Sequence, residues 1–281
     1  MNIQPVIDFA KPLFTLDLFR TLIGAAFGTF AGAWISSRAE RKKTVIAEIN
    51  SVSAAIELSI NICNRFMTLK KQIIRPFRDR FLLVRTNHEA YLAAPQTQQF
   101  QWQTDFQTIS QVTTPTEALE RCVFEETSVR GRALAAAVEL IAAINALHGT
   151  IDSRNNMIEE YRKNGLPPNL LETYLGLPTP QGVIDQRFST NVDALYAQTD
   201  QCIFFARLLA TDLVKYGNKK RRRYIWQFRL GMPKIKPTIW KMAEAENLLP
   251  PDADFKDWMR GFQVEPTKLS RLKTWLWAQF H

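Results

Sequence analysis

The chain has few of the residues from which most catalytic and metal sites are built. Its 281 residues include three histidines and three cysteines. No two histidines lie four positions apart, and Cys63, Cys122 and Cys202 form no CxxC pair, so we expect no metal site and no cofactor. Each cysteine falls at an apolar position of a helical pattern, which predicts buried free thiols in a reducing compartment.

The sequence also lacks a phosphate-binding glycine loop and a nucleophile elbow. The acidic pairs at 125–126 and 159–160 lie in long helical patterns, where solvated faces are the ordinary interpretation. Asp252, Asp254 and Asp257 alternate as in a calcium loop, but the required glycine and terminal glutamate are missing. We therefore predict that the protein is not an enzyme.

Strand-like alternation of useful length is missing as well, whereas helical spacing recurs along most of the chain. The predicted fold class is all-α, with one N-terminal transmembrane helix that continues into a cytoplasmic bundle of long antiparallel helices and a short-helix C-terminal tail. The predicted domains are a short extracytoplasmic segment (1–17), a transmembrane helix (18–37), a cytoplasmic helical bundle (38–218), and a basic, aromatic-rich segment with the tail (219–281).

Residues 21–37, TLIGAAFGTFAGAWISS, carry no charge. At about 1.5 Å per residue this apolar run covers about 26 Å, and Leu18, Phe19 and a snorkelling Arg20 extend it to roughly the 30 Å of a bilayer core. The run therefore predicts a membrane-spanning helix. The alternatives are a cleaved signal peptide, whose positive charge would precede the apolar run, and a buried helix of a soluble protein.

The flanking charges predict the orientation of this helix. Two basic residues, Lys11 and Arg20, precede the run, and four follow it within six positions. Because lysine and arginine are retained on the cytoplasmic side, we expect a single-pass protein of the cell (inner) membrane with its N-terminus outside and its C-terminal domain in the cytoplasm.

Three glycines, Gly24, Gly28 and Gly32, recur every four residues within the apolar run. Four residues advance an α-helix by about 400°, so the three lie along one face. Small residues allow close backbone approach between membrane helices, and this GxxxGxxxG stripe predicts a homo-oligomer or packing on another membrane protein.

Amphipathic helical patterns fill the predicted bundle. One pattern runs from Glu40 to Gln72, and Pro76 either kinks it or reverses the chain, of which we favour the reversal. A second runs from a cap at Thr114 to Asn164. A third opens at Thr179 and closes at Gly217, with a heptad seam that is more typical of an intramolecular bundle than of a dimer zipper. The seam residues are Phe188, Val192, Leu195, Thr199, Cys202, Ala206, Leu209, Leu213 and Tyr216.

A basic patch lies at 215–241, where ten basic residues occur without an acidic one. Without these ten, the chain has 26 basic and 27 acidic residues, so the net charge of +9 is local and predicts a local anionic partner. The residues chosen for this contact are Lys219, Lys220, Arg221, Arg222, Arg223 and Arg229, with Tyr224, Trp226, Trp275 and Trp277 as interfacial aromatics.

Three interpretations of the patch remain open: anionic lipid headgroups, nucleic acid, or a solvated charge run. The final amphipathic segment, with Leu269, Leu272, Leu276 and Phe280 on one face, either packs on the bundle or lies at the membrane interface. The sequence thus favours a membrane-anchored, non-enzymatic scaffold, sensor or membrane-acting effector whose partners include the lipid bilayer. The alternative is a membrane-tethered nucleic-acid-binding protein.

Overall fold

The computed structural model describes residues 16–93, 99–228, 233–241, 243 and 246–262. Two compact units are formed: unit 1 from residues 1–50 and 220–234, and unit 2 from residues 51–219 and 235–281. Within the described residues every regular element is a helix, and an isolated bridge between Pro178 and Ile184 is the one β-type pairing. The all-α prediction is confirmed.

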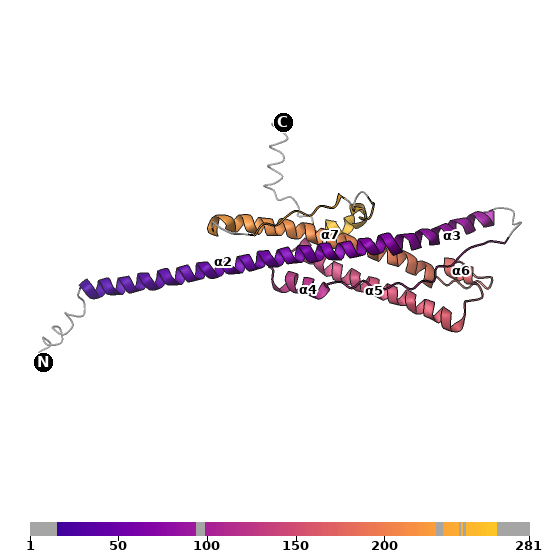
Figure 1. Cartoon of the computed structure of the whole chain (residues 1–281), viewed down its shortest axis with the longest axis horizontal. Helices are drawn as coiled ribbons and strands as arrows, with labels where there is room; N and C mark the ends of the chain where they lie inside the picture. The colour runs from indigo at the N-terminus through magenta and orange to yellow at the C-terminus, as the bar shows by residue number, and fades with distance from the viewer. Residues whose placement is uncertain (1–15, 94–98, 229–232, 242, 244–245, 263–281) are drawn as a thin grey trace, which may run out of the picture. The chain divides into compact units, whose positions relative to one another are not determined.

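The first helix, α2 (Leu16–Leu69), continues through a π-helical turn, η2 (Lys70–Ile74), into α3 (Arg75–Ala93) (Figure 1). The favoured reversal at Pro76 is therefore wrong. The Arg75 N–H donates to the Lys70 carbonyl five residues back. This wider turn directly precedes Pro76, whose missing N–H and bulky ring are incompatible with regular α-helical bonding, so the helical path continues through the proline.

The chain returns instead through residues 99–115, which form no helix or strand. Phe100 contacts Tyr91 of α3, and the Asp105 carboxylate pairs with Arg80. Farther along, the Thr113 carbonyl accepts from Arg65 of α2 at 2.8 Å. The segment thus runs antiparallel to α3 and the end of α2.

The predicted helix 114–164 is interrupted. It consists of α4 (Thr116–Glu120), a π-helical turn η3 (Arg121–Glu125) and α5 (Arg132–Asn164). Gly131 has a φ of +67°, a conformation that favours glycine, and it separates the two halves. No side chain caps α4, so the predicted cap at Thr114 is wrong, whereas the end at Asn164 is confirmed.

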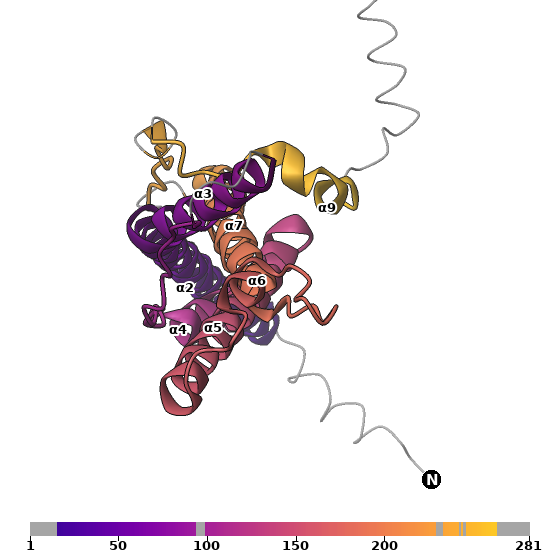
Figure 2. The same ribbon diagram turned by 90° about the vertical axis from the view of Figure 1, so that its right-hand side faces the viewer.

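After α6 (Leu170–Leu175), helix α7 (Arg187–Phe228) lies beside α5 (Figure 2). The contacts between them show that the two helices are antiparallel. Arg132 at the start of α5 pairs with Asp212, and Thr150 near its middle accepts from Asn191. The heptad seam is buried from Phe188 to Leu213, with Tyr216 half-buried, so its bundle interpretation is confirmed.

The prediction that Gly217 closes this helix is wrong, because α7 continues past it to Phe228 and the glycine lies buried inside the helix. A Cβ at this position would clash with Ile235 Cδ1 and lie 3.0 Å from Val52 Cγ1. The glycine therefore allows a close approach of other chain segments in unit 2, and the basic cluster that follows it is helical as far as Phe228.

The core of unit 2 contains an aromatic cluster at the junction of α3, α6 and α7. Tyr174 lies 4.5 Å from Phe188 between ring centroids, and Phe81 contacts both rings. All three cysteines are free and buried, as predicted. Burial raises the pKa of the Cys63 thiol to about 12, which keeps it protonated at neutral pH.

Residues 246–260 fold back onto unit 2 and end in two short helices, η4 (Asp252–Phe255) and α9 (Lys256–Arg260). Phe255 stacks on Phe204 of α7 with ring centroids 3.8 Å apart. The Lys70 ammonium, in the π-helical turn, donates to Asp200 at 2.5 Å and to the Leu248 carbonyl at 3.2 Å. The returning segment is thus fixed at the π-helical turn of the long helix.

Candidate functional site

The first part of α2, in unit 1, exposes its apolar side chains. Every side chain from Arg20 to Arg41 is exposed, and Phe30 reaches 75%. The large apolar members of this stretch are Leu22, Ile23, Phe27, Phe30, Trp34 and Ile35. Soluble monomers rarely expose so long a contiguous apolar surface, so this surface calls for a covering partner.

Two helical stretches of the described chain are long and apolar enough to cross a membrane, Arg20–Ala93 and Arg132–Asn164. The core helix of a soluble protein can have the same length and composition. Helix α5 fits that description, because Leu140, Ile144 and Leu147 are buried inside unit 2. The apolar window of the first stretch is itself 44% buried, so it lies farther along α2 than the run at 21–37, whose side chains are all exposed.

The glycine stripe lies on this exposed surface. A Cβ built at Gly24, Gly28 or Gly32 would meet nothing within 4 Å outside its own helix, so the face is open. The Thr29 hydroxyl, within the same run, donates to the Ala25 carbonyl at 2.7 Å. The polar group of this threonine is therefore satisfied inside the helix.

Where the apolar run ends, α2 meets the last two turns of α7 within unit 1. The Arg38 guanidinium donates to the Gln227 carbonyl at 2.6 Å and lies 5.4 Å from the Trp34 ring centroid. Nearly three turns farther along α2, Glu48 pairs with Lys220, and both side chains are largely buried. These contacts hold the basic cluster of α7 beside the residues that follow the apolar run.

The predicted basic cluster 219–223 does not form one surface. Five consecutive helical residues at about 100° each surround the helix completely. Lys220 turns inward to Glu48, whereas Arg222 and Arg223 are exposed on different sides of the helix. The helix thus carries two basic faces, each with its own set of residues.

The first face forms one wall of a groove of about 890 Å³ within unit 1, which we call the basic groove. Its other wall is α2. The residues that line it are Ser37, Glu40, Arg41, Lys43, Thr44, Val45, Glu48, Lys220, Arg223, Tyr224 and Gln227. Of its charged groups, Glu48 and Lys220 pair with each other, which leaves three exposed cations and the exposed Glu40 carboxylate. The groove therefore carries a net positive charge.

The residues of the second face do not line this groove. Lys215, Lys219, Arg222 and Trp226 are spaced four, three and four residues apart, which places them along one side of α7. All four are exposed, and Trp226 reaches 87%. We call these four residues the outer stripe.

Sequence reasoning selected the α7 half of the basic groove but missed the α2 half. Arg41 and Lys43 served there only to orient the helix. Nothing in the local sequence shows that they line the same groove as Arg223, about 180 positions away, because this depends on the return of α7 to α2. Arg229, Trp275 and Trp277, also selected from the sequence, lie outside the described residues.

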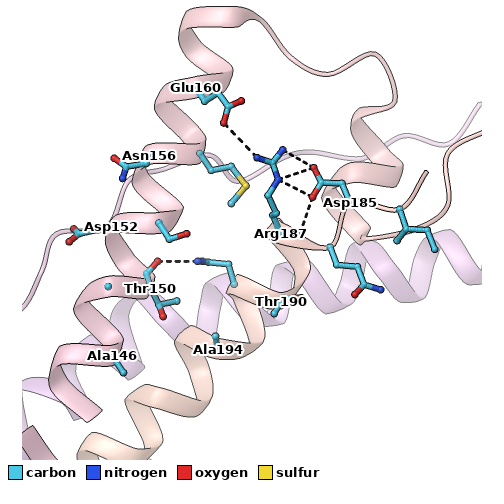
Figure 3. Close-up of a pocket in the computed structure, with 15 residues that line it drawn as sticks. Ala146, Thr150, Asp152, Asn156, Glu160, Asp185, Arg187, Thr190 and Ala194 are labelled. Carbon is cyan, nitrogen blue, oxygen red and sulfur yellow. Dashed lines mark hydrogen bonds and ion pairs between the residues drawn. The ribbon is translucent and has the colours of Figure 1, made fainter. Parts of the chain in front are cut away.

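A second groove, of about 1010 Å³, lies between α5 and α7 in unit 2 (Figure 3). Its one basic side chain, Arg187, is held by Asp185 at 2.8 Å and by Glu160 at 3.7 Å. The hydrogen bond from Arg187 lowers the pKa of the Asp185 carboxyl, so both groups stay charged. Since carboxylates neutralise this guanidinium and Asp152 adds a further negative charge, the groove is unsuited to an anion.

Among the described residues, no group of three or more histidine, cysteine, aspartate or glutamate side chains is placed to hold a metal ion. Comparisons with known protein families, with curated protein sequences and with solved structures find no match for this chain. The functional argument therefore rests on the exposed apolar helix and on the two basic faces of α7.

Proposed function

We propose that the protein is a single-pass membrane protein, anchored by residues 18–37, whose helical bundle lies in the cytoplasm. It acts as a non-enzymatic, self-associating scaffold, sensor or membrane-acting effector. The observation that carries this proposal is the complete exposure of the side chains of the apolar run. Lipid tails cover such a surface without requiring a protein partner.

Two further features support a bilayer around this run. The Thr29 hydroxyl is satisfied within its own helix, as polar groups in lipid must be. At the C-terminal end, Trp34 and Arg38 provide an amphipathic ring and a cation where a helix would emerge from the hydrocarbon. The basic residues that follow favour the cytoplasmic side for the bundle.

The anchor is tested by flotation of the full chain with vesicles after an alkaline carbonate wash. We expect the chain to float with the vesicles, because a spanning helix resists a wash that removes peripheral proteins. The double substitution Phe27→Arg and Phe30→Arg places two charges at the centre of the run, and we expect it to release the chain. A wild-type chain that stays in the aqueous fraction contradicts the anchor.

The orientation is tested separately with tags at both ends of the chain. In intact cells, added protease should remove the N-terminal tag and leave the C-terminal tag until the cells are lysed. A protected N-terminal tag with an exposed C-terminal tag contradicts the proposed topology while leaving the anchor itself intact.

A second candidate function, nucleic-acid binding at the membrane, is favoured by the outer stripe. Its three cations could neutralise phosphates, and Trp226 offers a fully accessible ring for base stacking. Binding of RNA or DNA that weakens steeply with salt and is lost on Arg222→Glu would favour this function over the scaffold.

A further inference from the structure

We propose that the basic groove binds the phosphate group of an anionic phospholipid from the leaflet around the anchor. This inference rests on the proposed membrane anchor and adds a defined ligand site to it. The residues that would bind the phosphate are Arg41, Lys43 and Arg223, which come from two distant parts of the sequence.

The position of the groove fits a headgroup. Ser37, the last residue of the apolar run, is also the first residue that lines the groove. With the run inside the hydrocarbon, the groove begins where the headgroup phosphates lie. Arg41 and Thr44 follow along α2 at one and nearly two helical turns from Ser37, so the groove extends through the headgroup region.

The chemistry of the groove also fits a phosphate. Arg41 and Arg223 face the groove from different helices, and guanidinium groups bind phosphate oxygens in a bidentate manner. Lys43 adds a third cation on the α2 wall, and Tyr224 brings a phenol to the α7 wall. The volume of about 890 Å³ lies within the range typical of small-molecule sites, about 300–1,000 Å³, and is ample for a glycerophosphate headgroup.

The buried pair of Glu48 and Lys220 gives the groove a fixed inner wall. Both side chains are largely withdrawn from solvent, and they join α2 to α7 inside the unit. Because Glu48 already binds Lys220, its carboxylate does not compete with a phosphate for the exposed cations. The exposed Glu40 carboxylate makes the groove less favourable for a polyanion than for a single phosphate.

A lipid is favoured over a nucleic acid for this groove because it presents its phosphate at a fixed depth beside the anchor. A nucleic-acid strand requires a row of cations along its backbone. Such a row occurs on the outer stripe, none of whose residues lines the groove. The two faces therefore allow a test that separates the ligands.

The test compares two adjacent arginines, because Arg222→Glu and Arg223→Glu change the net charge equally. The full chain in detergent micelles is titrated with phosphatidylglycerol, and bound lipid is counted by native mass spectrometry. We expect phosphatidylglycerol to bind at least roughly tenfold more tightly than phosphatidylcholine of the same acyl chains. Arg223→Glu should remove about tenfold of this affinity, and Arg222→Glu less than about twofold.

Further variants keep the result interpretable. Arg41→Glu, on the opposite wall, should reproduce the loss seen with Arg223→Glu, and Arg223→Lys should retain part of the affinity because it keeps the charge. Circular dichroism on each variant checks that helix content is unchanged. If Arg223→Glu unfolds the chain, Arg41→Glu and Arg223→Lys carry the comparison.

Four outcomes would overturn the proposal. Equal losses from Arg222→Glu and Arg223→Glu would indicate unspecific attraction, and equal affinity for the two lipids would remove the preference for a headgroup of net negative charge. Competition by soluble glycerol 1-phosphate as strong as that by lipid would indicate a free phosphate ester, and RNA binding lost with Arg223→Glu would indicate nucleic acid. Each of these results leaves the flotation test of the anchor unaffected, so the two proposals fail separately.

Discussion

At the scale of single residues, Arg154 of α5 shows how unit 2 accommodates a buried charge. The side chain is 1% exposed, and it donates to the carbonyls of Asp105 and Gln107 at 3.0 and 3.2 Å. Its guanidinium also lies 4.0 Å from the Phe77 ring centroid. Burial lowers the pKa of Arg154 to about 10, which still leaves it charged at neutral pH.

Replacement of Arg154 by lysine should therefore destabilise the protein. A lysine keeps the charge but loses the planar group that lies over the Phe77 ring and places its ammonium differently from Nη2, so we expect the free energy of unfolding to fall by about 2–4 kcal/mol. Arg162→Lys, at an exposed position of the same helix, serves as the control and should change it by less than about 0.5 kcal/mol. Equal effects in urea denaturation would contradict this account of Arg154.

Two glycines in helices allow a second matched comparison. Gly217→Ala places a methyl group against Ile235 and Val52, and we expect a loss of about 1–3 kcal/mol in the free energy of unfolding. Gly149→Ala, on an exposed face of α5, meets nothing within 4 Å and should raise this free energy by about 0.5–1 kcal/mol through helix propensity. Chemical denaturation measures both, and a stabilising Gly217→Ala would show that the close approach is unimportant.

At the scale of elements, the π-helical turn η2 joins the long helix to the segment that returns at 246–248. Lys70 is buried and binds Asp200 and the Leu248 carbonyl, whereas Lys71 is exposed and binds Glu246 at 2.8 Å. Burial raises the pKa of the Asp200 carboxyl, with the hydrogen bond from Lys70 acting in the opposite direction. The two adjacent lysines thus make similar contacts in very different surroundings.

Lys70→Met should lower the free energy of unfolding by about 3–5 kcal/mol, because it leaves the Asp200 carboxylate buried without its partner. Lys71→Met removes an exposed pair and should change it by less than about 1 kcal/mol. The double variant Lys70→Met with Asp200→Leu should recover much of the loss. Urea denaturation gives all three values, and similar effects of the two single substitutions would contradict the role of burial.

The elements also show which patterns in the sequence were sufficient for prediction. The seam of α7 was predictable because each buried position repeats with the helical period, so the pattern is local. The continuation through Pro76 and through Gly217 was not, because both exceptions depend on surroundings. A π-helical turn accommodates the proline, and the distant side chain of Ile235 explains the glycine. The basic groove required the same long-range information.

At the scale of the whole molecule, the open glycine stripe bears on how copies of the chain associate. Gly28 lies at its centre, and a Cβ added there would meet nothing within 4 Å outside its own helix. Contacts between helices in lipid depend on close packing, because the hydrophobic effect does not favour them there. A bulky side chain at the centre of the stripe should therefore separate the helices.

Gly28→Ile should raise the dissociation constant of the oligomer at least roughly tenfold in detergent or lipid. Ala26→Ile is the matched control, because residue 26 lies about 200° from Gly28 around the helix and adds the same branched side chain to the opposite face. It should leave association within about twofold of the wild type. Analytical ultracentrifugation of the full chain in a density-matched detergent measures both.

If Gly28→Ile and Ala26→Ile weaken association equally, or if the wild type is monomeric, the stripe does not join copies of the chain. A monomeric wild type would leave packing on a different membrane protein as the remaining role of the stripe.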